Sequence, residues 1–458
     1  MSIHERRPWA LLALLVAAQF MVVLDISIVN VALPSIGAGL GFAKADLQWV
    51  VTAYVVFSGG LLLVGGRAAD LFGRRRVFLA GLSLFTLASL ACGLAPSAGA
   101  LVTARAAQGA GAALLTPAAL SIITATYSGA QRATALSIWG AIASAGVAVG
   151  VLLGGVLTTA LSWHWVFLVN LPVGLAALAL APRVIPAFAP ERRSLDLPGA
   201  LAAVTGLALL VYALAGAAED GWSSARTLLP LAAAAALLAA FARIERSVRA
   251  PLLTPSVWRV GSLVSGTLMM LGVTGVMVGM FFVNSLYLQG VLGWSALETG
   301  LAFLPFVGAI TLGVHGTQHA IGRVGSRALM VAGLALVAAG ALLLAVAPDQ
   351  ASYAADLLPG FVVLGLGMGL AFPAISITAM NDVTHGLAGA ASGMLSTAHE
   401  IGAALGVAVL SAIALAGSGL DYGAATLAAA VVAAALAILA AAVVPVVRPA
   451  AGAHVTVH

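Results

Sequence analysis

The segment Gly65–Arg76 reads GGRAADLFGRRR and separates two long apolar runs early in the chain. It combines small residues, which let helices approach closely, with one carboxylate, Asp70, and four arginines. Because arginines beside a spanning helix hold that end on the cytoplasmic side, the segment is interpreted as a cytoplasmic loop between two membrane helices. Composition alone favours a loop that sets topology over a loop that acts as a conformational latch.

The composition of the whole chain indicates a polytopic membrane protein. Of its 458 residues 62% are hydrophobic and 8% are charged, with a mean hydropathy of +1.12, whereas globular domains carry about 25% charged residues. Apolar runs of about 20 residues, the length that crosses a bilayer as a helix, recur throughout and leave no room for a soluble domain. The single cysteine, Cys92, excludes a disulfide framework and a multi-cysteine metal site.

Charge, proline and glycine breaks predict an all-α protein with fourteen spanning helices. They are expected near 9–33, 46–66, 77–95, 100–126, 135–159, 163–182, 198–217, 227–242, 261–288, 297–316, 328–347, 356–380, 388–417 and 423–447. We expect three parts: an N-terminal six-helix bundle (1–182), two additional helices with cytoplasmic linkers (183–260), and a C-terminal six-helix bundle (261–458).

The distribution of basic residues predicts the orientation. With the N-terminus in the cytoplasm, most of the twenty lysines and arginines fall inside, and only Lys44 and Arg226 fall outside, while Arg105 lies within a span. Both termini are therefore expected in the cytoplasm. The cytoplasmic set is Arg6, Arg7, Arg67, Arg74, Arg75, Arg76, Arg132, Arg183, Arg192, Arg193, Arg243, Arg246, Arg249, Arg259, Arg323, Arg327 and Arg448.

The two six-helix blocks look like related halves. The basic loop after the second span has a degenerate counterpart after the tenth, Gly322–Arg327 (GRVGSR), which lacks an equivalent of Asp70. Duplicated bundles with a site between them are typical of secondary transporters. The sequence lacks a P-loop, Gly-x4-Gly-Lys-Ser/Thr, which argues against transport driven by ATP on this chain alone, and no cofactor is expected.

Three ionisable residues lie inside predicted spans: Asp25, Arg105 and Glu400. A charge at the centre of a spanning helix costs about 2.5–3.5 kcal/mol on insertion scales, so each needs a reason. At 1.5 Å per residue, Asp25 and Arg105 lie at similar depth, and two interpretations stay open. They form an ion pair that only joins two helices, or they take part in proton coupling, since a moving cation changes the protonation of a nearby carboxylate. Glu400 is expected to bind either protons or the charge of a substrate.

Other polar and small residues complete the candidate site. Arg105, Gln108, Gly109 and Ala112 follow helical spacing and share one face. The candidate substrate cavity consists of Asn30, Gln108, Asn284 and Tyr287. Gly146, Gly150 and Gly154, with Gly155, form a small-residue surface suited to close helix packing.

Several of these stretches resemble one family, the drug:proton antiporters of the major facilitator superfamily, in their fourteen-span branch. Leu24–Pro34 (LDISIVNVALP) resembles the signature of the first helix, and Arg105–Gly111 (RAAQGAG) resembles the fourth-helix motif whose arginine is implicated in proton coupling. Trp163–Pro172 (WHWVFLVNLP) also fits the branch. The loop motif between helices 2 and 3 is matched by Gly66, Asp70, Gly73, Arg74 and Arg75, and with Arg67 these residues form the candidate conformational latch.

Two stretches depart from that pattern. The helix 5 motif, usually Gly-Pro-x-x-Gly-Gly, reads GVLLGG at Gly150–Gly155, without the proline. His399 and Glu400 stand where many relatives have Arg-Gln. The second change adds a membrane carboxylate, which is compatible with cationic substrates.

The resemblance implies an antiporter of the cytoplasmic (inner) membrane, not an enzyme, that exchanges protons for lipophilic drugs or antibiotics by alternating access. Its expected partners are a small lipophilic substrate, cationic ones included, protons and the lipid bilayer, with no nucleic acid, and it is expected to work as a monomer. One alternative is a proton-linked or facilitative metabolite carrier. Another is a non-transporting membrane sensor or scaffold, which would be expected to carry a soluble output domain.

Overall fold

The computed structural model describes residues 3–43, 46–186, 196–221, 223–248, 251, 255–348, 350–384, 387–416 and 419–444. Over these residues the chain is helical and contains no strand. Five of the basic residues used to predict the orientation lie outside the described residues: Lys44, Arg192, Arg193, Arg249 and Arg448.

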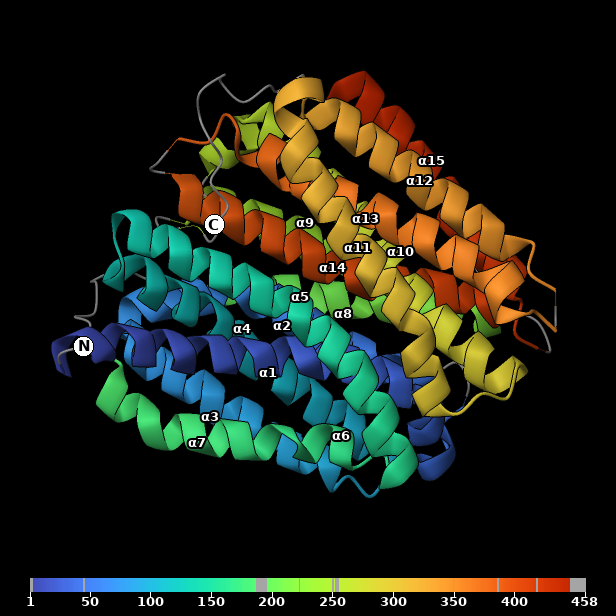
Figure 1. Cartoon of the computed structure of the whole chain (residues 1–458), viewed down its shortest axis with the longest axis horizontal. Coiled ribbons are helices and arrows are strands. Elements are labelled where there is room, and N and C mark those ends of the chain that lie inside the picture. Colours follow the sequence, from blue (N-terminus) through green and yellow to red (C-terminus); the bar gives the residue numbers. More distant parts are fainter. Residues whose placement is uncertain are drawn as a thin grey trace.

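Eight helical segments make up the first part of the chain (Figure 1). They are α1 (Ile3–Leu40), η1 (Asp46–Gln48), α2 (Trp49–Phe72), α3 (Arg74–Gly93), α4 (Ala98–Thr126), α5 (Gly129–Ala160), α6 (Trp165–Leu168) and α7 (Asn170–Val184). Helices α6 and α7 together cover one predicted span, because the chain bends at Val169 without leaving the helical region.

The remaining segments follow in the same up-and-down manner. They are α8 (Leu197–Asp220), α9 (Ala225–Ser247), η2 (Pro255–Arg259), α10 (Gly261–Leu286), the π-helical η3 (Tyr287–Val291), α11 (Ala296–Val324), α12 (Ser326–Ala345), the π-helical η4 (Tyr353–Leu357), α13 (Leu358–Met380), α14 (Ala388–Ala414) and α15 (Tyr422–Val443).

Twelve helices of the described residues are long and apolar enough to cross a membrane. Helices α5 and α8 carry shorter apolar stretches, Ala145–Ala160 and Pro198–Leu214, which fall below the length of about 20 residues that a span needs. The all-helical prediction is confirmed, but the count of fourteen spans is not.

Two of the predicted boundaries are wrong, each for its own physical reason. Helix α1 does not stop before Pro34 but continues to Leu40, because a proline inside a membrane helix is tolerated where neighbouring helices pack around it. The predicted loop Gly66–Arg76 is also helical except at Gly73, whose φ of 92° ends α2 and lets α3 begin one residue later. Gly325 (φ 82°) makes the corresponding turn between α11 and α12.

The helices pack as two groups that meet along two seams. Helices α1 to α7 pack on one another, as do α10 to α15, and Figure 1 shows the first group, in blue to green, below the second, in yellow to red. Helix α2 packs against α14 and α5 against α11 across the interface. The pair α8 and α9 packs together, and α8 touches both α2 and α14, so it covers one edge of the first seam.

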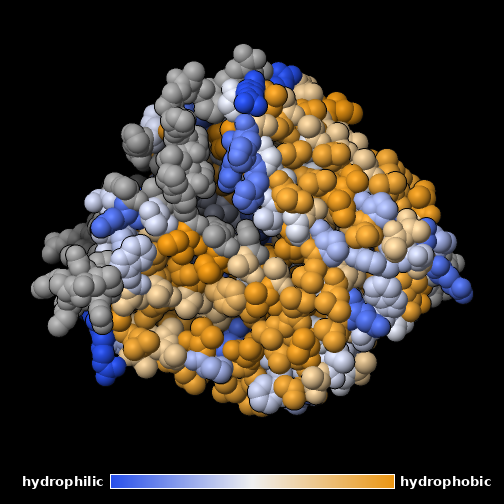
Figure 2. Space-filling view, in the orientation of Figure 1, coloured by the Kyte–Doolittle hydropathy of each residue, from blue (hydrophilic) through white to orange (hydrophobic). Residues whose placement is uncertain are grey.

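The outer surface is apolar, as a lipid-facing surface must be. Figure 2 shows hydrophobic side chains over most of the visible middle of the molecule, with hydrophilic ones mainly toward its edges. Large apolar side chains such as Leu229, Leu312 and Ile438 are about two-thirds or more exposed. That exposure would be unfavourable in water and is explained by contact with lipid tails.

Candidate functional site

Asp25 of α1 lies in the interior of the first helix group and forms an ion pair with Arg105 of α4. The Arg105 Nη1 to Asp25 Oδ2 distance is 2.5 Å, and both side chains are almost completely buried. Arg105 also donates from Nε to the Val50 carbonyl at 2.8 Å and lies above the Tyr54 ring, 4.4 Å from its centroid. Both contacts are with α2, so the guanidinium connects three helices.

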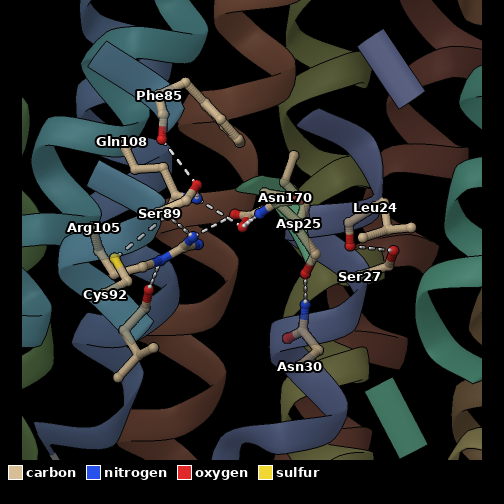
Figure 3. Close-up of polar contacts among 12 residues, drawn as sticks. Leu24, Asp25, Ser27, Asn30, Phe85, Ser89, Cys92, Arg105, Gln108 and Asn170 are labelled. Atoms are coloured by element: carbon tan, nitrogen blue, oxygen red, sulfur yellow. Dashed lines mark hydrogen bonds and ion pairs between the residues drawn. The ribbon is translucent and has the colours of Figure 1, made fainter. Parts of the chain in front are cut away.

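Two amides complete the surroundings of the carboxylate (Figure 3). Gln108 and Asn170 each donate to Asp25 Oδ1, at 2.7 Å and 2.8 Å. Gln108 also donates to Ser89 Oγ at 2.8 Å and accepts from Arg105 at 2.7 Å. We call Asp25, Ser89, Arg105, Gln108 and Asn170 the Asp25 cluster. Both oxygens of its carboxylate are hydrogen-bonded, which a buried charge requires.

Local helix geometry brings these side chains together. Arg105 and Gln108 are three residues apart on α4 and therefore lie on one face. Asn170 is the first residue of α7, directly after the bend that separates it from α6. On α3, Ser89 and Cys92 are likewise three residues apart, and the Cys92 Sγ lies 3.6 Å from Gln108 Oε1.

The predicted proximity of Asp25 and Arg105 is thus observed, whereas Ser89, Asn170 and Tyr54 were missed. Asn170 carried a usable signal, since it is the single amide in the apolar stretch WHWVFLVNLP. Tyr54 carried none, because an uncharged aromatic side chain does not stand out in an apolar run, and Ser89 carried none, because a serine hydroxyl in a membrane helix bonds its own backbone at little cost. Ser89 does so as well, donating to the Phe85 carbonyl at 2.9 Å.

Glu400 of α14 lies apart from the Asp25 cluster, on the seam between the two helix groups. Ser58 of α2 donates to its Oε2 at 2.7 Å, and Gly59 leaves room for the Glu400 side chain, since a Cβ on Gly59 would collide with Glu400 Cβ. Glu400 nevertheless keeps some accessible surface. Its neighbour His399 turns to the other side and hydrogen-bonds Thr274 of α10 at 3.1 Å.

The four residues expected in a substrate cavity lie in different places. Gln108 is part of the Asp25 cluster, and Asn30 donates to the Ile26 carbonyl of its own helix at 2.8 Å. Asn284 accepts from the Tyr422 hydroxyl at 2.7 Å and lines a cavity of about 10 Å³ inside the second group. The Tyr287 hydroxyl donates to the Pro348 carbonyl at 2.6 Å. All four are buried.

The candidate latch residues surround the turn between α2 and α3. Gly66, Arg67 and Asp70 belong to the last turns of α2, and Arg74 and Arg75 to the first turn of α3. They are partly exposed, whereas Gly73 between them is buried. The close approach to α4 occurs at Gly65, where a Cβ would collide with the carbonyl of Ala113. Asp70 and Arg74 each have an interaction partner.

The glycines of α5 face two different partners. Gly146, Gly150 and Gly154 lie against Val23, Ser27 and Ile28 of α1, respectively. Ser27 Oγ also donates to the Gly146 carbonyl at 3.3 Å. Gly155 instead faces Ala296 and Leu297 of α11, across the interface. Helix α5 thus packs tightly within its own group and on the second group.

The described residues contain no group of three or more His, Cys, Asp or Glu side chains that could hold a metal ion.

Comparison with known proteins shows close similarity to antibiotic export and resistance proteins. The chain is 41% identical to the cephamycin export protein CmcT of Amycolatopsis lactamdurans, over 91% of this chain and 87% of that protein. It is 43% identical to the puromycin resistance protein pur8 of Streptomyces alboniger, over 89% and 82%. With the multidrug resistance protein Stp of Mycobacterium tuberculosis it shares 38% identity, over 86% and 73%.

Solved structures share the fold at low sequence identity. The human organic anion transporter MFSD10 (TETRAN) superposes with a TM-score of 0.64 at 16% identity, over 96% of this chain and 100% of that one. A peptide transporter, POT, solved with sulfate, gives 0.69 at 15% identity, over 94% and 93%. The family model for the Major Facilitator Superfamily matches residues 15–407. This chain, a polytopic membrane transporter and not an enzyme, therefore belongs to the Major Facilitator Superfamily.

Proposed function

We propose that this transporter is a proton-coupled antiporter of the fourteen-span drug:proton branch, which exports lipophilic drugs or antibiotics across the cytoplasmic membrane. The observation that carries the proposal is the Asp25 cluster, a carboxylate held by an arginine and two amides in the buried interior of one helix group. Relatives named for the export of cephamycin or for resistance to puromycin support the direction and the substrate class.

The coupling step uses the competition between Arg105 and a proton for the Asp25 carboxylate. While Arg105 stays in place, its charge stabilises the ionised carboxylate. When α1 and α4 shift, the guanidinium moves away, the isolated charge becomes costly, and Asp25 takes a proton. One proton crossing a potential of 100 mV supplies about 2.3 kcal/mol, which corresponds to a concentration ratio of roughly fifty for the exported substrate.

Alternating access would come from rocking of the two helix groups, 1–182 and 261–458, about their shared seams. The seams of α2 with α14 and of α5 with α11 support this division. In this proposal α5 completes the first bundle, and α8 and α9, within 183–260, are the two additional spans. Both termini lie in the cytoplasm, no cofactor takes part, and the monomer is sufficient.

The experiment that tests coupling is efflux driven by a pH gradient in proteoliposomes. Asp25→Asn should abolish gradient-driven efflux and leave ligand binding largely intact, because the amide keeps the shape of the side chain and one acceptor oxygen but cannot exchange a proton. The matched control is Asp382→Asn, since Asp382 is an exposed carboxylate bonded to the neighbouring Asn381. Gradient-driven efflux at the wild-type rate in Asp25→Asn would refute Asp25 as the coupling acid.

A metabolite carrier is the second candidate, favoured by the missing proline in Gly150–Gly155. Expression in cells that lack their own drug pumps separates the two functions. A drug exporter lowers the accumulation of dyes such as ethidium, and a metabolite carrier does not.

A further inference from the structure

Two exposed histidines on α11 take no part in the proposed export mechanism. His315 and His319 lie in the C-terminal half of that helix, and both side chains are exposed. An ionisable side chain on a membrane helix almost always faces water or the interior of a helix bundle, because lipid tails do not solvate it. The two imidazoles therefore mark a part of α11 that water reaches.

Helix packing shows on which side of α11 these side chains lie. Near its N-terminus α11 packs on α5, where Gly300 faces the Val151 carbonyl. Farther along the helix, Gly313 and Thr317 contact α13. His315 follows Gly300 by about four turns and so lies near the side that meets α5, away from α13. Figure 1 shows the C-terminal end of α11 well apart from the N-terminal end of α5, and Figure 2 shows hydrophilic side chains over this end of α11.

Hydrogen bonds to the backbone fix which nitrogen of each ring carries the proton. The Nδ1 atom of His315 lies 2.9 Å from the Thr311 carbonyl oxygen, and that of His319 lies 2.8 Å from the His315 carbonyl oxygen. A carbonyl only accepts, so each Nδ1 donates, and a neutral ring keeps its lone pair on Nε2. Neither Nε2 atom has a hydrogen-bond partner among the described residues. Metal-binding histidines are oriented in this way, with one nitrogen bonded to an oxygen acceptor and the other left for the ion.

The spacing of the pair suits a shared metal ion. Residues four apart on a helix lie one above the other, and two histidines at this spacing bind zinc in a known class of sites. Imidazole nitrogen is a preferred ligand of zinc, nickel and copper, whereas magnesium and calcium prefer oxygen. Arg323, one turn beyond His319, is exposed, so water and salt screen its charge. No third His, Cys, Asp or Glu joins the pair among the described residues.

We propose that His315 and His319 form a binding site for one divalent transition-metal ion on the exposed side of α11. Each imidazole gives the lone pair of its Nε2 atom, and water occupies the remaining positions around the ion. The site differs from a closed structural zinc site, which uses four protein ligands. It goes beyond the proposed export of drugs and does not depend on it, because neither histidine belongs to the Asp25 cluster.

Calorimetric titration of Ni²⁺ into the purified full-length protein, without an affinity tag, tests the proposal. His454 and His458 are also four residues apart in the sequence and lie outside the described residues, so both are replaced by glutamine in the background protein. His315→Gln and His319→Gln should each weaken Ni²⁺ binding by roughly tenfold or more, because the second ligand acts at a high effective concentration. Both positions are exposed, so thermal unfolding curves close to that of the background show that the fold is intact.

Two further variants separate the effect of the pair from the number of histidines. His164→Gln removes an imidazole that has no histidine four residues before or after it, and this variant should bind Ni²⁺ normally. Thr311→His combined with His319→Gln rebuilds a pair one turn earlier on α11, at another exposed position. This double variant should regain most of the affinity that His319→Gln loses.

Three outcomes overturn the proposal. They are the absence of saturable Ni²⁺ binding to the background protein, background affinity in either His315→Gln or His319→Gln, and a loss in His164→Gln as large as that in His319→Gln. Displacement of Ni²⁺ by an equal concentration of Mg²⁺ would also contradict a site made of imidazoles. The titration involves no transport, so its result is independent of the efflux test on Asp25→Asn.

Discussion

The two halves of this transporter repeat their turns but not their polar interiors. Gly73 and Gly325 adopt positive φ values of 92° and 82° at the equivalent turns between paired helices. The first half encloses a charged cluster around Asp25 and Arg105, whereas the second half encloses neutral contacts. There the Tyr422 hydroxyl bonds Asn284, and the Tyr287 and Tyr422 rings stack with centroids 4.0 Å apart.

This difference indicates what each half contributes. A buried ion pair is costly to desolvate and strongly destabilising when one partner is removed, so a charged interior is a poor way to hold helices together. A neutral amide and two phenols hold them together at lower cost. The first half therefore carries the charged interior on which the proposed proton coupling rests, whereas the interior contacts of the second half are neutral.

The largest effect is expected when the charged interior loses its cation. Arg105→Met should lower the free energy of unfolding by about 3–5 kcal/mol, because it leaves the Asp25 charge buried without a partner. Thermal or chemical unfolding of the purified protein in detergent measures this change. The double variant Asp25→Asn with Arg105→Met should recover part of the loss, and an unchanged melting temperature in the single variant would show that the cluster is not dry.

The shared turns should respond alike in both halves. Gly73→Ala and Gly325→Ala each place a Cβ where φ is positive, which costs on the order of 1–3 kcal/mol. The same unfolding experiment is expected to give two similar losses. A large loss in one variant beside none in the other would break the correspondence between the two turns.

The neutral interior should be less sensitive than the charged one. Tyr422→Phe removes the donor to Asn284 Oδ1 and keeps the ring stack, so a loss of about 1 kcal/mol is expected. Comparison with Arg105→Met in the same unfolding assay sharpens the contrast between the halves. A loss as large as that of Arg105→Met would contradict it.

The smallest effect on stability is expected at Asp70, the carboxylate that has no equivalent near the turn at Gly325. Asp70→Asn lies at a partly exposed position and should change stability by no more than about 0.5 kcal/mol. If the residues around Gly73 form a conformational latch, the variant should still slow transport, which initial efflux rates in proteoliposomes measure. Unchanged rates and unchanged surface expression would leave these residues as a topology-setting anchor.

Part of the site was predictable because it is energetically conspicuous. Asp25, Arg105 and Glu400 stand out in any apolar sequence, since a charge in a span costs free energy whatever the fold. Ser89 and Tyr54 do not stand out, and Gln108, although it shares a helix face with Arg105, was expected in a substrate cavity. Their roles depend on which helices meet, and the spacing of small residues predicts that a helix face packs closely without identifying the helix that it packs on.

The sequence by itself determined that this chain is a helical membrane protein, and it predicted two similar basic turns, because hydropathy, basic residues and turn glycines act locally along the chain. Only the tertiary structure decided that Asp25 accepts hydrogen bonds from Arg105, Gln108 and Asn170, whereas Glu400 accepts one from Ser58 among the described residues. The physical reason is that burial and pairing of a charge depend on neighbours from distant helices. The sequence alone does not show which of the two membrane carboxylates, Asp25 or Glu400, is paired with a cation.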